Sequence, residues 1–595
     1  MASTLHFSPR PNRASEIRWQ PWGPQAFELA KDQSKPVLLA ISAVWCHWCH
    51  VMDETSYSDP GVIDLINEHF VPIRVDNDQR PDVNARYNLG GWPTTAILTP
   101  EGEILRGGTY IPPEQMLAFL KQVSDLYAEP ANRLEFARRI AEVRSKRTRV
   151  PTGTPGALDP NEPARIAAAA SGAFDDEYGG FGAEPKFPHT DVLHFLLDLY
   201  AREPVGRTQT IVQMSLRAMA GGGMYDHVEG GFFRYSTTRD FSVPHFEKML
   251  EDLGGLLLAC ARASALFGDD ALGRVAADTK RYMDASLWVA GRRGYGGSQD
   301  ADEQYYGLDK DARARETAPY VDPTIYASWN AQAARALIVG APLLAAVGVG
   351  VREWTQRGLD VLEMLWSDLL VDGLMARYSD GDSARVRGLL GDQAWSGWAA
   401  LAGFEATGLP IWLERARALV DACEALYDEA AGAYLDRLPD ESEPGKVSDP
   451  VAPLAENALM ARVLLGLHAF QGEERFAVRA CSVLERFTVS AERMGVFAAP
   501  HASAVLDLLN PPYDIKISGA PSGSAVLRMR DRLLAVGAPP LRVNTIPPEL
   551  ASAGAPADND GEPVALVCRG TTCFARVRDA DAVLESIARE KSSAL

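Results

Sequence analysis

The spacing of apolar and polar positions divides the chain into three regions. Up to about Tyr127, apolar runs of strand length alternate with helical periods, so this part is predicted to be α/β. From Asn161 to Leu509, helix follows helix, with apolar residues at i, i+3, i+4 and i+7. From Tyr513 onwards the pattern returns to α/β. The sequence therefore predicts a multi-domain protein with a large all-α centre.

Roughly a dozen helices are expected in the central region. Glycine-rich loops of very unequal length separate them, and paired helices in this number favour an (α/α)6 toroid. Such a toroid has six hairpins, an inner ring around a funnel, and long loops that line its mouth. A helical solenoid is the alternative, but no fixed repeat period is visible.

These patterns predict four segments. Residues 1–128 form an α/β domain, 129–160 a helix and linker, 161–509 the toroid, and 510–595 a small C-terminal α/β segment. The linker is indicated by proline, glycine and threonine after Arg149.

A C-x-x-C motif follows the first apolar run, at a predicted turn from strand to helix, where a thioredoxin keeps its redox pair. A helix N-terminus favours a thiolate over a thiol, so Cys46 is the expected nucleophile. Cys49 would then be the resolving thiol. We expect His47 to stabilise the thiolate and His50 to carry a proton for Cys49. The helix is expected to begin near Val51.

Three other interpretations of this motif are open. C-x-x-C-H also attaches c-type haem, but that follows export, and residues 1–11 contain no apolar signal region. Zinc or copper at Cys46, Cys49 and His50 is a second alternative. A structural pair of buried thiols is the third.

A proline at the head of a later strand supports the redox interpretation. Trp92-Pro93 precedes an apolar strand, and thioredoxin-like domains place a cis-proline there, opposite the dithiol, where backbone groups hold the substrate chain. We therefore assign Pro93 to the catalytic set and Trp45 and Trp92 to substrate binding. A trans proline in a turn is the alternative.

Composition restricts the partners and the compartment. The 595-residue chain has a net charge of -20, which argues against nucleic acid and anionic membrane as partners. The longest uncharged run outside the dithiol segment, 336–351, is too short and too rich in glycine to span a bilayer. Seven cysteines are too few for a disulfide scaffold, and Cys260, Cys423 and Cys481 are expected as buried free thiols. A cytoplasmic location is predicted, where the dithiol would cycle.

The predicted toroid carries loops rich in glycine, aromatic and charged residues. His245, Lys248 and Asp252 are expected on one helical face. Carboxylates, histidine and aromatic platforms suit a carbohydrate site. The alternatives are a non-catalytic binding funnel and pure scaffolding. The predicted substrate-binding residues of the toroid are Lys186, Tyr225, Asp226, His227, Arg234, His245, Glu247, Lys248, Asp300, Asp302 and Trp329.

A second close cysteine pair lies in the tail. Cys568 and Cys573 follow a predicted strand and precede a helix near Asp579. This pair could relay electrons to the first dithiol, bind a metal with it, or consist of two buried thiols.

Taken in order, the motifs resemble those of the spermatogenesis-associated protein 20 family. That resemblance implies a thioredoxin-like domain fused to a six-hairpin toroid related to N-acylglucosamine epimerases and glycosidases. The matching segments are Pro21-Trp22-Gly23, Ala26-Phe27, Cys46–Met52, Arg80–Val83, Gly90–Pro93, Pro185–Pro188, Tyr225–His227 and Val243–Leu250.

Two departures are informative. The acidic run before Arg80 is weakened to Asp76-Asn77-Asp78-Gln79, which puts charge-based docking there in doubt. Ala40 stands where ordinary thioredoxins have a buried acid, so deprotonation of Cys49 would need His50, Asp53 or water.

Together these observations predict a thiol-disulfide oxidoreductase-like protein that needs no cofactor. Its partner would be a protein or small-thiol redox partner, and a sugar-like ligand could occupy the toroid. The rival hypotheses are a sugar epimerase, isomerase or glycosidase with a regulatory thioredoxin domain, and a non-catalytic protein that binds a metal or a partner.

Overall fold

The computed structural model describes residues 5–132, 135, 136, 138, 155–546, 563–570 and 572–593. Most of the predicted helix and linker at 129–160 lies outside these residues. The chain divides into two compact units. The first comprises Met1–Thr152, Ser298–Asp302 and Leu435–Ala452, and the second comprises the remainder.

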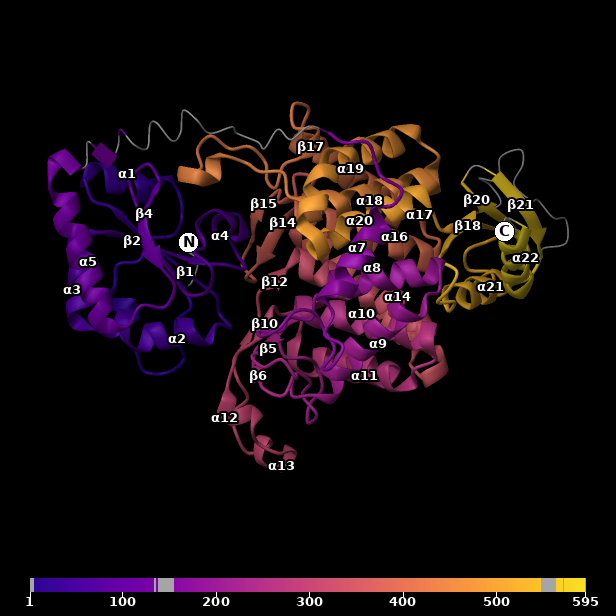
Figure 1. The fold of residues 1–595 in the computed structure, drawn as a ribbon, viewed down its shortest axis with the longest axis horizontal. Helices are drawn as coiled ribbons and strands as arrows, with labels where there is room; N and C mark the ends of the chain where they lie inside the picture. Colours follow the sequence, from indigo (N-terminus) through magenta and orange to yellow (C-terminus); the bar gives the residue numbers. More distant parts are fainter. Residues whose placement is uncertain are drawn as a thin grey trace. The chain divides into compact units, whose positions relative to one another are not determined.

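The first unit is built on a four-stranded sheet with the order β2-β1-β3-β4 (Figure 1). Strand β1 runs parallel to β2 and antiparallel to β3, and β3 runs antiparallel to β4. The strands are β1 (Val37–Ser42), β2 (Val71–Asp76), β3 (Thr94–Leu98) and β4 (Ile104–Gly108). The helices are α1 (Pro24–Asp32), α2 (His47–Glu54), α3 (Pro60–His69), α4 (Pro81–Tyr87) and α5 (Pro113–Ala128).

Strand β1 is apolar throughout because both faces of the sheet are covered. Leu38 packs into one core with residues of α3 and α5, whereas Leu39 packs into a second core with residues of α1 and α4. Alternate side chains of a strand point to opposite faces, so an uninterrupted apolar run is the expected sequence of such a strand. This confirms the predicted thioredoxin-like α/β domain.

Two segments expected in the toroid pack with the first unit instead. Within Leu435–Ala452, Val447 joins the core around Tyr87. Arg86 of α4 donates to Asp436 at 2.8 Å, and Arg437 donates to Asp82 at 2.7 Å. The short segment Ser298–Asp302, which contains β10 (Ser298–Gln299), is the other one.

The second unit contains the predicted (α/α)6 toroid. In the described residues, six helices contact one another in a closed ring, and each packs against one outer helix. The inner helices are α8 (Thr190–Arg202), α10 (Leu250–Phe267), α14 (Ala327–Leu343), α16 (Leu390–Thr407), α18 (Leu454–Gln471) and α20 (Ala499–Leu509). The outer helices are α7 (Glu162–Ala173), α9 (Gly206–Gly221), α11 (Asp270–Tyr282), α15 (Val351–Met364), α17 (Pro410–Ala422) and α19 (Glu474–Met494).

Short elements fill the loops of the toroid. These are α12 (Glu303–Tyr306), α13 (Lys310–Arg313), β5 (Tyr235–Ser236), β6 (Pro244–His245), β7 (Lys248–Met249), β8 (Trp288–Val289), β9 (Gly294–Tyr295), β11 (Val321–Asp322), β12 (Ile325–Tyr326), β13 (Leu370–Val371), β14 (Leu374–Ser379), β15 (Ala384–Arg387), β16 (Tyr427–Asp428) and β17 (Ala433–Tyr434). Inner helices α10, α16 and α18 each end at a left-handed glycine, which allows the sharp reversal towards the outer helix.

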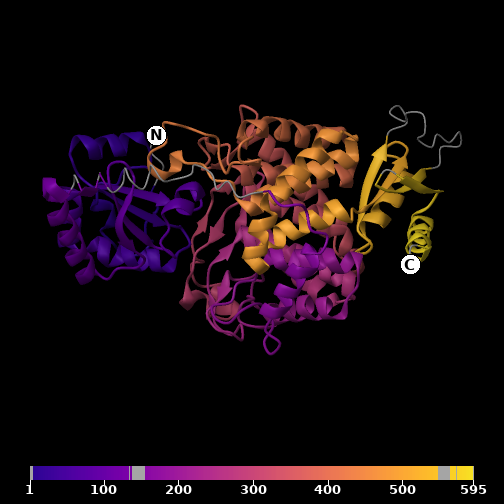
Figure 2. The same cartoon turned by 45° about the horizontal axis from the view of Figure 1, so that its top comes forward.

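The C-terminal segment, yellow in Figure 2, folds into another four-stranded sheet, with the order β19-β18-β20-β21. Its elements are β18 (Tyr513–Ser518), α21 (Ser524–Leu534), β19 (Leu541–Ile546), β20 (Val564–Arg569), β21 (Thr572–Val577) and α22 (Ala580–Ser593). Strand order and directions repeat those of the first sheet, because β18 is parallel to β19 and antiparallel to β20. The sequence predicted only a small α/β segment here, so this repeated topology is new information.

Candidate functional site

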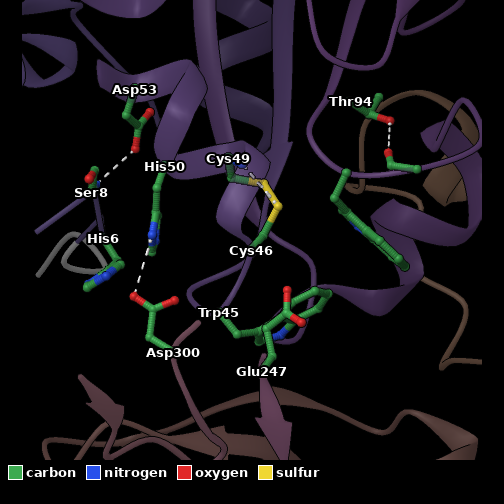
Figure 3. The surroundings of a disulfide bond; sticks show 12 residues. His6, Ser8, Trp45, Cys46, Cys49, His50, Asp53, Thr94, Glu247 and Asp300 are labelled. Carbon is green, nitrogen blue, oxygen red and sulfur yellow. Dashed lines mark hydrogen bonds and ion pairs between the residues drawn. A yellow bond between two sulfur atoms is a disulfide. The ribbon is translucent and has the colours of Figure 1, made fainter. Parts of the chain in front are cut away.

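The dithiol lies where the sequence predicts it, between β1 and α2. Cys46 is the N-cap of α2, and its Sγ accepts a hydrogen bond of 3.2 Å from the Cys49 backbone N–H. The two sulfur atoms form a disulfide (Figure 3). Helix α2 begins at His47, so the expected start near Val51 is wrong. The reason is that Cys46 itself caps the helix, which places both thiols at its first turn.

The Trp92–Pro93 peptide bond is cis and directly precedes β3, as predicted. The Trp92 ring meets the Trp45 ring edge to face, with 5.7 Å between centroids. Trp45 Nε1–H donates to Asp78 at 2.7 Å, and Trp92 Nε1–H donates to Asn84 at 3.2 Å. Both indoles are therefore held in fixed orientations, while their substrate-binding role stays a prediction.

His50 is a neutral imidazole in this unit. Burial, followed by the nearby His6, lowers the pKa of His50 to about 4. Its Nδ1 lies 3.4 Å from a carboxylate oxygen of Asp300, which comes from the short segment Ser298–Asp302 (Figure 3). Its Nε2 is buried without a hydrogen-bond partner in the described part of the chain. A neutral ring with an open nitrogen can accept a proton only transiently.

Asp53, the other expected proton carrier, is bound in a buried ion pair. Arg74 donates two hydrogen bonds to its carboxylate, at 2.8 and 2.9 Å. The Ser8 backbone N–H donates a third at 3.1 Å. These three donors engage the Asp53 carboxylate in structural contacts, so His50 or water remains the expected proton carrier for Cys49.

Lys186, Asp226 and Lys248 lie in two loops of the same design. Each loop is a turn closed by an aspartate, whose carboxylate accepts from backbone N–H groups and from a lysine. Lys186 donates to Asp175 at 2.6 Å, and Lys248 donates to Asp226 at 2.7 Å. Each lysine also donates to a glycine carbonyl of its own turn. Both ammonium groups are fully buried, so the structure gives these residues ion-pair partners within their loops.

The expected helical face of His245, Lys248 and Asp252 does not exist. His245 and Lys248 lie in strands β6 and β7, and α10 begins only at Leu250. The physical reason is the pairing of His245 with Tyr235 across β5 and β6, which holds this stretch extended. The imidazole of His245 stacks on the Tyr235 ring and bonds to Glu247.

The other predicted residues are dispersed. The Tyr225 hydroxyl is buried without a partner in the described residues, and His227 bonds to the Gly222 carbonyl at 3.0 Å. Arg234 is partly exposed, and its backbone N–H donates to the Glu247 carbonyl. Asp300 and Asp302 belong to the first unit. Trp329 is buried against Tyr326. Their substrate-binding roles remain predictions.

An axial cavity of about 520 Å³ lies inside the ring. Residues of all six inner helices line it, together with residues of α21 and the loop that follows. Of the residues that line it, only Asp252 is named in the predictions from sequence. The polar and aromatic side chains of the lining include Asp191, His194, Asp198, Asp252, Arg262, Gln332, Arg335, Trp395, Trp398, Glu405 and Arg462.

Arginine side chains surround the carboxylate of Asp198 in this cavity. Asp198 is buried, which alone would raise its pKa, but Arg262, Arg462 and Arg202 outweigh burial and lower it. Arg262 and Arg462 donate to this carboxylate at 2.6 and 3.0 Å. Burial raises the pKa of Asp252 to about 6 and that of Glu405 to about 7.

A sequence signal for the cavity existed. Asp191, His194, Asp198 and Arg202 recur at helical spacing on a helix that is otherwise largely buried and apolar. A polar stripe on an inner helix must face either a polar cavity or buried partners, because every other face is packed.

The second cysteine pair forms a disulfide across the hairpin of β20 and β21, where Cys568 and Cys573 are directly opposite. This pair belongs to the second unit and the first dithiol to the other, so the predicted relay stays untested. In the described part of the chain, no group of three or more His, Cys, Asp or Glu side chains is arranged to hold a metal ion. Across the same residues, no helix has the length and apolarity needed to cross a bilayer.

Residues 10–144 match the family described as Thioredox_DsbH, protein of unknown function, DUF255. The chain is 36% identical to spermatogenesis-associated protein 20 of Rattus norvegicus over 294 residues, which cover 46% of this chain and 37% of that protein. For the Homo sapiens protein the identity is 35% over 328 residues, or 51% and 41% of the two chains. The predicted family resemblance is confirmed, over about two fifths of the length of these relatives.

Solved structures with a similar ring include cellobiose 2-epimerase from Spirochaeta thermophila. It is 17% identical, has a TM-score of 0.47, and covers 59% of this chain and 94% of its own. A family 76 glycoside hydrolase from a bovine Bacteroides thetaiotaomicron strain is 10% identical, with a TM-score of 0.42, and covers 59% and 76%.

Proposed function

For a chain that resembles the spermatogenesis-associated protein 20 family, we propose thiol-disulfide exchange at Cys46 and Cys49, with the toroid as an appended binding funnel. The observation that carries this proposal is the dithiol at the N-terminus of α2 in a unit with a cis-proline before β3. The helix N-terminus stabilises a thiolate, and the loop at Pro93 offers backbone groups to an extended substrate.

The proposed reaction is a two-step exchange. The Cys46 thiolate attacks one sulfur of a substrate disulfide, which forms a mixed disulfide and expels the other sulfur as a thiolate. Cys49, after losing its proton to His50 or water, attacks the Cys46 sulfur. The substrate disulfide has then been reduced by two electrons to two thiols, and Cys46 and Cys49 have been oxidised to a disulfide. A small thiol or a protein dithiol then reduces this disulfide, which fits a reducing, cytoplasmic setting.

The test is the redox midpoint of the Cys46–Cys49 pair in the full-length protein. Thiols are trapped in graded glutathione or dithiothreitol buffers, with Cys46→Ser as the control. We expect a reversible two-electron transition at roughly -270 to -200 mV, between thioredoxin and glutaredoxin. Cys49→Ser should accumulate a mixed disulfide with substrate, and Cys46→Ser should not. The absence of a reversible transition would refute the proposal.

The metal alternative is tested on the same sample. Bound zinc or copper requires thiolate ligands, so it competes with the disulfide seen in this structure. Metal analysis of the reduced protein, repeated with Cys46 and His50 changed together, measures the stoichiometry. One ion per chain that disappears in the double variant would favour metal binding over redox chemistry.

A second candidate function is acid-base chemistry on a carbohydrate in the axial cavity. The observation in its favour is Asp252, whose carboxyl borders the cavity, has no hydrogen-bond partner in the described residues, and has a pKa of about 6. A carboxyl whose pKa is raised towards neutrality stays protonated in part of the molecules there and can act as a general acid. Turnover of a sugar that is lost in Asp252→Asn and kept in Cys46→Ser would establish this function.

A further inference from the structure

We infer that the axial cavity binds an acidic carbohydrate, with Arg335 holding the anionic group and the carboxyls of Asp191 and Asp252 holding hydroxyl groups. The inference deepens the carbohydrate proposal and rests on the toroid acting as a binding funnel. It names the chemical class of the ligand and the residues that would recognise it.

Arg335 is a half-buried cation without a direct counter-charge. It borders the cavity and lies 3.6 Å from the centroid of the Trp398 ring, but within the described residues it makes no hydrogen bond or ion pair. Its cationic neighbours Arg262 and Arg462 share the carboxylate of Asp198. Burial, followed by those two arginines, lowers the pKa of Arg335 to about 9, so it still carries its charge at neutral pH.

A half-buried guanidinium without a paired carboxylate is less stable than a paired one. Glu405, the other carboxyl near it, has a pKa of about 7 and is only partly ionised. A bound anion would supply the missing charge. The guanidinium has five N–H donors and no acceptor, so it suits a carboxylate or a phosphate group.

Carboxyl groups, in contrast to the guanidinium of Arg335, border the cavity near the N-terminal ends of two inner helices. Asp191 and Asp252 lie in the first turns of α8 and α10 and border the cavity. Burial raises the pKa of both carboxyls, and neither has a hydrogen-bond partner in the part of the chain that the structure describes. Unpartnered carboxyl oxygens accept hydrogen bonds from hydroxyl groups, which a carbohydrate carries in number.

The distance between Asp252 and Arg335 along the cavity suits a ligand of the size of one sugar. A Cβ on Gly254 of α10 would lie 3.4 Å from Ala333 of α14, and one on Gly340 of α14 would lie 3.5 Å from Ala261 of α10, so the two helices run parallel. Asp252 precedes the first contact by two residues and Arg335 follows it by two. Four residues of helix rise place them about 6 Å apart along the axis, which is close to the length of one hexose.

The volume and the aromatic lining agree with this ligand. About 520 Å³ lies within the range of small-molecule pockets, roughly 300 to 1,000 Å³. Trp395 and Trp398 both border the cavity, with 5.5 Å between their ring centroids. The guanidinium groups of Arg335 and Arg462 lie over the Trp398 ring, so the aromatic ring we assign to the apolar side of a sugar is that of Trp395. Hydroxyl acceptors, an anion receptor and aromatic rings in one cavity together specify an acidic sugar.

The test compares three probes on the full-length protein by calorimetric titration and thermal shift. D-Glucuronate carries a carboxylate, D-glucose 6-phosphate carries a phosphate, and D-glucose carries neither. We expect at least one acidic sugar to bind and to raise the Tm, and glucose to bind at least tenfold more weakly. The two acidic probes show which anion the cavity prefers. No binding of either acidic sugar, or equal binding of glucose, would overturn the inference.

Arg335→Met is the decisive variant, with Arg281→Met on the exposed face of α11 as the matched control. Removing Arg335 should lower the affinity for the acidic sugar roughly tenfold to a hundredfold. It should leave the Tm without ligand unchanged or higher, because an uncompensated charge is removed. Retained binding, or a marked loss of Tm without ligand, would instead make Arg335 a structural residue and contradict the inference. Binding without turnover would refute only carbohydrate catalysis.

Discussion

The ion pair between Asp53 and Arg74 gives the sharpest prediction for the first unit. Both side chains are almost completely buried, with 0% and 4% exposure, and two hydrogen bonds join them. Asp53→Asn keeps the shape of the side chain but leaves the Arg74 guanidinium without its counter-charge. Breaking a buried pair in this way costs about 3 to 5 kcal/mol. Since 1.4 kcal/mol is a factor of ten, the folding equilibrium of this unit should fall roughly a hundredfold to several thousandfold.

The assay is scanning calorimetry of the full-length protein, with alkylation of the reduced Cys46 as a local probe of the first unit. We expect the transition of this unit to fall by roughly 10 °C. Asp64→Asn, on the exposed side of α3, is the matched control and should change stability by less than about 0.5 kcal/mol.

A double variant separates lost charge pairing from lost packing. Replacing Asp53 and Arg74 together by methionine removes both charges and should recover most of the loss. An Asp53→Asn protein as stable as the control would refute the reasoning.

Three further predictions concern other groups. The pKa of His50 is about 4 in the folded protein and 6.5 in the unfolded chain, so the unfolded state binds more protons between these two pH values. The free energy of unfolding should therefore rise with pH across this window, by at most about 3 kcal/mol. His50→Asn should flatten this pH dependence when it is measured by calorimetry. Lys248→Met removes two buried hydrogen bonds and should cost about 2 kcal/mol of toroid stability in urea unfolding, whereas the exposed Lys310→Met should cost almost nothing; equal effects would contradict a structural role. Reducing the Cys568–Cys573 disulfide frees a short loop and should cost the C-terminal sheet about 2 kcal/mol, measured as faster amide exchange in β20 and β21; unchanged exchange would oppose this.

The repeated sheet topology shows where sequence patterns fall short. Strand β1 is apolar throughout, whereas β18 alternates apolar and polar residues. Both are followed by a helix, yet only the first has cysteines at the strand-to-helix turn. The register of β18 with β19 and β20 depends on pairings between distant residues. An apolar run predicts that a strand is buried, but it does not predict which strands flank it.

Local sequence determined the features that depend on neighbouring residues. The apolar run before Cys46 and the C-x-x-C spacing predict a strand that leads into a helix, because both rest on short-range geometry. A proline after Trp92 makes a cis bond accessible at this position, and the structure shows that the bond is cis. The helical period likewise predicted the hairpins of the ring, because an inner helix must be apolar wherever it is packed.

Only the tertiary structure decided which charged groups meet. Asp300 reaches His50, Asp436 reaches Arg86, and Arg335 faces a cavity shared by six helices, although each partner is far away in the sequence. Electrostatic free energy depends on distance and burial, and both are fixed by chain packing. A carboxylate or guanidinium therefore shows its chemistry in the sequence, but its partner only in the fold.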